Sequence, residues 1–127
     1  MRIGTKPGSD NWWDLSPDGS QIAMAFPEGE NRIRLLPLDG GAPRDLVVNG
    51  WSGFRTADWS QNGKGIYVSS SSPRGATLLY IDLEGHANAV WEQKGGLMTM
   101  GAPSPDAHHL AILGFTLDSN VWMIENF

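Results

Sequence analysis

The 127-residue sequence contains no cysteine. This absence excludes disulfide bonds, thiolate nucleophiles and cysteine-ligated zinc, but both reducing and oxidising compartments tolerate such a chain. No apolar run approaches the roughly 18 residues that a membrane span needs, and the N-terminal "MRIGTKPGSD" lacks the apolar segment of a signal peptide. As given, the chain is expected to have neither signal peptide nor membrane insertion. Its localisation, periplasmic or cytoplasmic, stays unknown.

Charged residues are also few, at 18% of the chain, and acidic side chains outnumber basic ones by 14 to 9. The formal net charge of −5 argues against nucleic acid or an anionic membrane as the partner. Glycine and proline, by contrast, are frequent, with 16 and 8 residues, which indicates many turns and short strands. The length and the 40% hydrophobic content suit a single globular domain.

One stretch, "WDLSPDGSQIA", recurs in two weaker copies, "DWSQNGKGIYV" and "PSPDAHHLAIL". The serines that begin the three turns, Ser16, Ser60 and Ser104, follow one another at intervals of 44 residues. Apolar residues keep the same register, in the columns of Ile22, Ile66 and Leu110 and of Met24, Val68 and Ile112. The chain is therefore periodic, which has to be recognised before any fold is assigned.

Each repeat is predicted to form four short strands with alternating apolar side chains, joined by tight turns. In the first repeat the strands are "NWWDLS", "IAMAF", "RIRLLPL" and "PRDLVV". The third repeat has "MGAPS" and "NVWMIE" but ends before a fourth strand. Because no stretch of eleven or more residues carries a helical apolar stripe, the predicted fold class is all-β, built from four-stranded antiparallel meanders.

A repeat of 44 residues with four strands is typical of a β-propeller blade. The pattern W-S-P-D-G-x-x-I-A, followed by I-x-x-x-x-x-D-G-G, resembles the TolB-type, WD-repeat-like propeller family. Residues 13–23 and 33–41 carry it well, and residues 59–68 and 104–112 carry it less faithfully. The departures from the pattern are Gln61-Asn62, Pro103 (for Trp) and Ala107 (for Gly).

The resemblance implies about three blades in this chain. Residues 13–56 and 57–100 are expected to form two full blades, and residues 101–127 a blade of three strands. Residues 1–12 are expected to supply an outer strand and connection that complete a neighbouring blade. In this arrangement the chain is a circularly permuted set of blades, because the first strand has no blade of its own.

Three blades cannot enclose a channel, since propeller rings have four or more. The chain is therefore expected to assemble with itself, as a homodimer with six blades or a homotrimer with nine. Ring closure would pair the strand around Ile3 with the third strand of a neighbour, which contains Val121 and Met123. The alternative is that the sequence is an isolated fragment of a larger TolB-like sensor protein.

Loops at one rim of such a ring carry aromatic and arginine residues, the usual components of contact hot spots. The candidate binding residues are Trp51, Phe54, Arg55, Arg74, Lys94, Met98, Glu30 and Arg32. An alternative for Trp51 is that it folds back onto a blade. The predicted function is a non-catalytic interaction or scaffold module that binds a protein or peptide at its rim or channel, as the resemblance also implies.

No motif for catalysis, cofactor binding or metal binding is present, so no cofactor is expected. His108 and His109 are neighbours that would point to opposite faces, and they are interpreted as part of a solvated turn. Asp14 and Asp58 are expected to lie too far apart for a carboxylate pair, because they occupy equivalent positions in different blades. The alternative function is a propeller enzyme, a hydrolase or lyase, with its site in the channel. Its nearest candidate residues are Asp10, Asn11 and Arg55.

Two further expectations concern packing. Trp13, Trp59 and Trp91 are predicted to be core side chains that pack between blades. The serine run at residues 69–72 is predicted to be a loop of small polar residues, because no base or oxyanion motif accompanies it.

Overall fold

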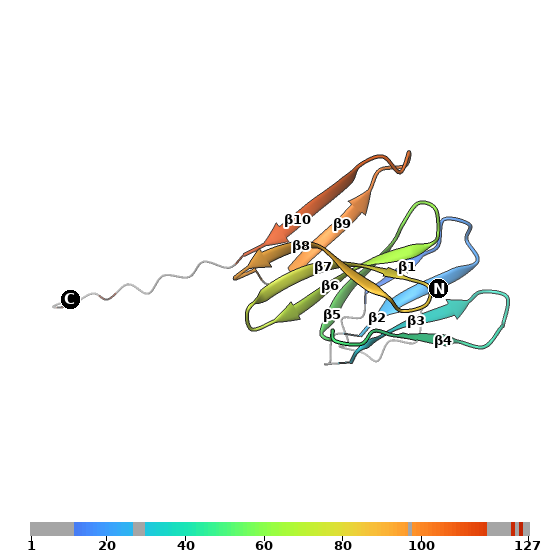
Figure 1. Cartoon of the computed structure of the whole chain (residues 1–127), viewed down its shortest axis with the longest axis horizontal. Coiled ribbons are helices and arrows are strands. Elements are labelled where there is room, and N and C mark those ends of the chain that lie inside the picture. The colour runs from blue at the N-terminus through green and yellow to red at the C-terminus, as the bar shows by residue number, and fades with distance from the viewer. Residues whose placement is uncertain (1–11, 27–29, 97, 117–122, 124, 126–127) are drawn as a thin grey trace.

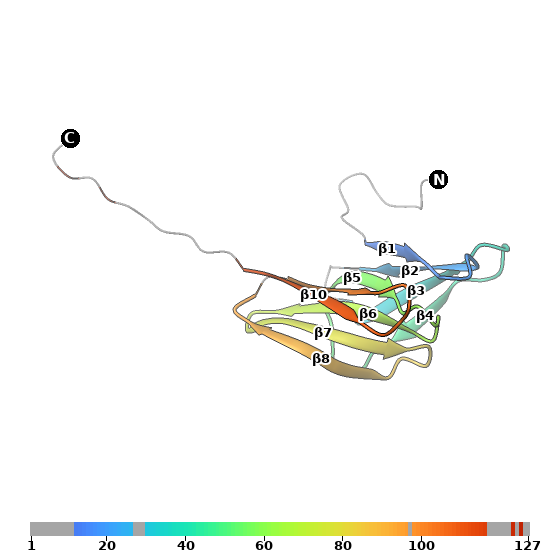
Figure 2. The ribbon, with the colours of Figure 1, turned by 90° about the horizontal axis from the view of Figure 1, so that it is seen from above.

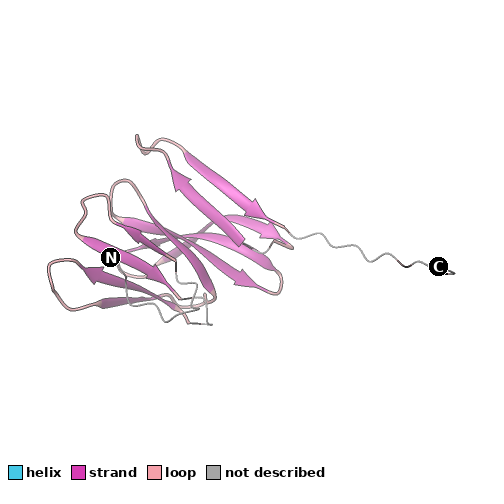
Figure 3. Cartoon of the chain, turned by 180° about the vertical axis from the view of Figure 1, so that it is seen from behind, coloured by secondary structure: helices cyan, strands magenta, loops and turns pink. Residues whose placement is uncertain are grey.

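The computed structural model describes residues 12–26, 30–96, 98–116, 123 and 125. This part of the chain contains no helix, and so none that is long and apolar enough to cross a membrane (Figure 3). The prediction of an all-β chain is confirmed. The strands are β1 (Trp13–Leu15), β2 (Gln21–Ala25), β3 (Arg32–Pro37), β4 (Arg44–Val47), β5 (Phe54–Trp59), β6 (Gly65–Ser72), β7 (Gly75–Asp82), β8 (Ala87–Lys94), β9 (Met98–Pro103) and β10 (Leu110–Phe115).

The strands form a first sheet, β1-β2-β3-β4, a second sheet, β5-β6-β7-β8, and the hairpin β9–β10. Neighbours in each sheet are consecutive in the chain and antiparallel, so the predicted four-stranded meanders are confirmed. The second sheet lies in the middle, with β5 against the first sheet and β6 and β7 against the hairpin (Figures 1 and 2). The predicted strands within residues 1–12 and 120–125 fall almost entirely outside the described residues.

The core lies between the first and second sheets. In β2, Ala23 and Ala25 are fully buried on the face toward the second sheet, while Ile22 and Met24 are buried on the other face. This is the alternation expected of a strand with period 2. The core cluster comprises Ala23, Ala25, Ile33, Leu35, Leu46 and Val48 from the first sheet and Phe54, Ala57, Trp59, Ile66, Val68, Leu79 and Ile81 from the second.

The turn between β1 and β2 is held by side-chain hydrogen bonds to the backbone. The Ser16 hydroxyl donates to Asp18 Oδ1 at 2.7 Å and accepts a hydrogen bond from the Gln21 N–H at 3.1 Å. Asp18 Oδ1 also accepts from the Ser20 N–H at 3.0 Å. The Ser20 hydroxyl donates to the same oxygen at 2.7 Å, and this bond, with those from the Ser16 hydroxyl and the Ser20 N–H, lowers the pKa of Asp18 to about 2. The local sequence therefore determines this turn, because Asp and Ser side chains commonly stabilise turns by hydrogen bonds to the nearby backbone.

The same hydrogen bonds recur in the turns at residues 60–65 and 104–109, where Asn62 and Asp106 take the place of Asp18. The fourth residue of each turn has a positive φ. These values are 73° at Gly19, 69° at Gly63 and 63° at Ala107. The 44-residue repeat is thus a repeat of backbone conformation, and Ala107 occupies a position that favours glycine.

The predicted loop at residues 69–72 is wrong, because this serine run forms the end of β6. Ser69 and Ser70 are buried, and their hydroxyls have partners. Ser69 Oγ accepts a hydrogen bond from the Thr99 N–H at 3.0 Å, and Ser70 Oγ donates to the Ser52 carbonyl at 2.6 Å. A buried hydroxyl is tolerated where it is hydrogen-bonded, so these serines can stand in a strand.

We expect Ala107→Gly to raise the free energy of unfolding by about 0.5–1 kcal/mol, because glycine relieves the cost of a left-handed conformation at this turn. Urea unfolding followed by circular dichroism measures the change. Ala102→Gly, in the exposed part of β9, is the matched control and should lower stability by about 0.5–1 kcal/mol, since glycine weakens a strand. Loss of stability in Ala107→Gly would contradict this interpretation of the turn.

Candidate functional site

Most of the predicted rim residues gather at one end of the second sheet, where β5 begins, β6 ends, β7 begins and β8 ends. A hydrogen bond from the Gly95 N–H to the Arg74 carbonyl, at 3.2 Å, joins the turn between β6 and β7 to the end of β8. Arg55, Arg74 and Lys94 are exposed at this end, and none of the three forms an ion pair with another described residue. This end of the sheet therefore presents three unpaired cations.

The two aromatic residues of the predicted rim lie differently. Phe54, the first residue of β5, is fully buried in the core, which corrects the expectation of an exposed ring. The physical reason is that Phe54 belongs to β5, and a β-bulge between Phe54 and Thr56 shifts the alternation so that Phe54 lies on the same core face as Ala57 and Trp59. Trp51 is half-buried and packs against the core cluster, as in the fold-back alternative.

Glu30 and Arg32 form part of an ionic network on the first sheet. Arg32 Nε lies 2.8 Å from Glu30 Oε2, and Arg32 Nη1 lies 2.8 Å from Asp45 Oδ2. Arg34 Nε lies 2.9 Å from Asp45 Oδ1, and both guanidinium groups stand 5.4 Å from the centre of the Phe26 ring. The two arginines hold the pKa of Asp45 below its ordinary value. These charges are satisfied within the chain.

The remaining predicted site residues are only partly described. Met98 begins β9 and is half-buried, and Met123 is exposed. Ile3, Val121, Asp10 and Asn11 lie outside the described residues. Ring closure through Ile3, and a channel site with Asp10 and Asn11, therefore stay predictions.

The inner strands of the two sheets are linked by Trp59 and Asp14. The Trp59 backbone N–H donates to Asp14 Oδ2 at 2.9 Å, and the indole Nε1–H donates to the Asp14 carbonyl at 3.0 Å. The indole itself is almost fully buried in the core. One residue thus supplies the packing and two hydrogen bonds at the junction of the first and second sheets.

The equivalent junction one repeat later, between the second sheet and the β9–β10 hairpin, lacks these contacts. Asp58 is the 44-residue equivalent of Asp14, and Pro103 is the equivalent of Trp59. Proline has no backbone N–H, and Asp58 Oδ2 is buried without a hydrogen-bond partner among the described residues. The side chain of Trp12 does hydrogen-bond to the Asp58 carboxylate. Pro103 therefore accounts for the unpartnered oxygen.

Burial and the nearby charge of Asp14 raise the pKa of Asp58 from 3.8 to about 6. Asp14 and Asp58 were expected to lie too far apart for a carboxylate pair, yet they are close enough for the charge of Asp14 to act on Asp58. Both residues lie on inner strands, β1 and β5, which contact each other at the junction between the sheets. Equivalent residues of neighbouring repeats are close together when they belong to the innermost strands.

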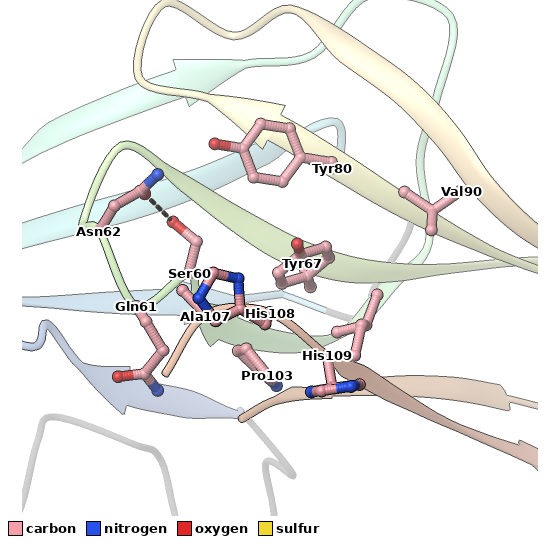
Figure 4. A pocket seen from close by; sticks show the side chains of 11 residues that line it. Ser60, Gln61, Asn62, Tyr67, Tyr80, Val90, Pro103, Ala107, His108 and His109 are labelled. Carbon is pink, nitrogen blue, oxygen red and sulfur yellow. Dashed lines mark hydrogen bonds between the residues drawn. The ribbon is translucent and has the colours of Figure 1, made fainter. Parts of the chain in front are cut away.

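An open cavity of about 460 Å³ lies between the second sheet and the β9–β10 hairpin (Figure 4). Tyr67 and Tyr80 form one wall, with ring centres 5.3 Å apart in an edge-to-face arrangement. His108 and His109 are exposed at the mouth, in the turn where they were expected. The other lining residues are Ser60, Gln61, Asn62, Val90, Pro103, Ala107 and Leu110. None of them was predicted as a site residue, although the change from Trp to Pro103 in the repeat column was a visible signal.

Apolar side chains on β1 are exposed where their equivalents on β5 are buried. Trp13 and Leu15 are 47% and 44% exposed, whereas Ala57 and Trp59, 44 residues later, are 0% and 2% exposed. The prediction of a buried Trp59 is confirmed, whereas Trp13 is exposed in the single chain and its packing between blades stays a prediction. The reason is that the first sheet packs on β5, whereas no described element covers β1 in the same way.

Apolar side chains on β8 and β10 are likewise exposed where their equivalents in the first sheet are buried. Leu113 on β10 is 52% exposed, whereas Ala25, two repeats earlier, is fully buried. Trp91 on β8 is 48% exposed, whereas Leu46, at the corresponding position of β4, is buried, so Trp91 is not a core residue within the single chain. The hairpin has only two described strands and does not cover the outer half of the second sheet.

We expect the stability of the protein to fall as the pH rises from about 4 to 6. In this window the unfolded chain, with an Asp pKa near 3.8, has lost the Asp58 proton that the folded chain, with a pKa of about 6, retains. Asp58→Asn removes this difference. Urea unfolding at pH 4.5 and 6.5 should show a smaller decrease in the variant than in the wild type. Equal decreases in the two proteins would rule out a raised pKa at Asp58.

Within the described residues, no three His, Cys, Asp or Glu side chains are grouped so as to hold a metal ion. Comparison with protein-family models and with curated proteins finds no match for this chain. The assignment of function therefore depends on the geometry of the junctions, the exposed faces and the cationic end of the second sheet.

Proposed function

We propose that this chain is a β-propeller interaction module. In this proposal the two four-stranded sheets are propeller blades and the β9–β10 hairpin is the inner half of a third. Copies of the chain assemble through the exposed apolar faces at the two ends of the blade series, and the closed ring binds a protein or peptide at its rim. The 44-residue repeat and its resemblance to TolB-type repeats support this proposal.

The observation that carries the proposal is the exposure of Trp13, Leu15 and Leu113 in repeat columns that are buried between the first two sheets. A second copy that packs on β1 as the first sheet packs on β5 would bury them. Full burial of such a side chain contributes roughly 1.5–3 kcal/mol, so half-exposed residues gain about half of that. A handful on each face reaches the range of the association cost, about 4–15 kcal/mol.

The faces offered at the two ends differ from each other. The first sheet presents β1, and the hairpin presents β10, so the contact between copies would be heterologous. Such contacts generate a closed ring when a whole number of subunits completes one full rotation. Two copies would complete six blades and three copies nine.

For the rim, the three unpaired cations Arg55, Arg74 and Lys94 favour an acidic partner. Their side chains lie at one end of the second sheet, on segments joined by backbone hydrogen bonds. Long-range attraction to a negatively charged peptide would be weakened by salt. The cations also stand out because the chain as a whole carries a net charge of −5.

We expect light scattering to give a native mass of two or three times 13.8 kDa. Leu113→Glu should reduce the mass to 13.8 kDa, because it places a charge in the proposed interface between copies. Ala42→Glu adds the same charge to the exposed connection between β3 and β4, and it should leave the mass unchanged. A wild-type mass of 13.8 kDa would contradict the proposed assembly.

A further inference from the structure

The cavity beside the hairpin occupies the place that Trp59 fills at the preceding junction. Trp59 is buried against the first sheet in the same cluster as Ala23 and Leu35. The equivalents at the next junction are Pro103, on β9, and Tyr67 and Tyr80, which pair across β6 and β7 as Ala23 and Leu35 pair across β2 and β3. The proline ring is much smaller than an indole, and an open space of about 460 Å³ lies next to it.

The two junctions also differ in their hydrogen bonds. At the first junction Trp59 donates two hydrogen bonds to Asp14, and at the second Asp58 Oδ2 is buried with no donor among the described residues. Asp58 lies directly opposite Tyr67 across β5 and β6, so both side chains are on the face toward the hairpin. The second junction thus lacks the indole and the backbone N–H that Trp59 supplies at the first, although it has the rings of Tyr67 and Tyr80 in place of Ala23 and Leu35.

We infer that this cavity is a binding site for a planar aromatic side chain, with tryptophan in an extended peptide as the ligand that fits best. The inference goes beyond the proposed function, because this cavity lies beside the β5–β6 turn, at the opposite end of the second sheet from the rim cations. The internal template is Trp59, whose indole packs in the equivalent position one repeat earlier. A volume of about 460 Å³ lies within the range of ordinary ligand sites.

The lining suits an aromatic guest. Tyr67 and Tyr80 already meet edge to face, and a third ring can add a further edge-to-face or offset contact. Among the described residues, neither tyrosine hydroxyl has a hydrogen-bond partner, so both are available to the indole N–H or to the peptide backbone. Val90 and Leu110 supply apolar surface, and the amide of Gln61 stands at the turn (Figure 4).

The test uses N-acetyl-L-tryptophanamide as the probe and the full chain as the protein. Titration calorimetry of the wild type should show saturable binding with a dissociation constant of about 0.1–1 mM, the range for a ligand of this size. Pro103→Trp places an indole in the cavity, as Trp59 does at the first junction, and it should weaken binding of the probe at least tenfold. Pro103→Ala restores a backbone N–H without filling the cavity, and it should bind the probe within threefold of the wild type.

Three results would overturn the inference: no saturable binding by the wild type, unchanged binding by Pro103→Trp, or equal binding of N-acetyl-L-leucinamide. If circular dichroism shows that Pro103→Trp does not fold, the Tyr80→Leu variant tests the binding site instead. It introduces the residue found at the equivalent position Leu35, and it should weaken binding at least fivefold. Light scattering of the same samples separates this site from ring assembly, because the site lies within one chain. Probe binding by a monomer would contradict only the assembly.

Discussion

The contact between Trp59 and Asp14 is the interaction on which the arrangement of the sheets depends. It joins the inner strands β1 and β5 by two hydrogen bonds and places an indole in the main core. Because the chain repeats at intervals of 44 residues, this contact also defines what the next junction should contain. The second junction departs from it at Pro103, and there Tyr67 and Tyr80 also stand in place of Ala23 and Leu35. The unpartnered oxygen of Asp58 and the adjacent cavity both follow from that departure.

Strands and turns were predictable because their causes are local. Ser16, Asp18 and Gly19 specify a turn by hydrogen bonds and a positive φ, and the same chemistry recurs at the two later turns. Side-chain burial was harder to predict. Trp13 and Trp91 have the composition of core residues, yet whether such a side chain is buried depends on whether a neighbouring sheet covers it. Alternation along a strand identifies a face but not what packs on that face.

The junction with Pro103 shows a second limit. The replacement of Trp by Pro was visible as a departure from the repeat, but its consequence lies in the residue that faces it. Only the pairing of the inner strands shows that residue 103 should donate to Asp58. Likewise, the proximity of Asp14 and Asp58 could not be judged from their separation of 44 residues, because it depends on the contact between the inner strands β1 and β5.

The most direct test of this account is an NMR titration of the Asp58 carboxyl carbon in the wild type and in Pro103→Ala. A backbone N–H at residue 103 would donate to the Asp58 carboxylate as the Trp59 N–H donates to Asp14, and a hydrogen bond to the charged form favours it, so Pro103→Ala should lower the pKa of Asp58 from about 6 by about one unit. Asp14 remains in place in both proteins and serves as an internal reference for the junction. An Asp58 pKa that is the same in both proteins would contradict the repeat-based equivalence of Trp59 and Pro103.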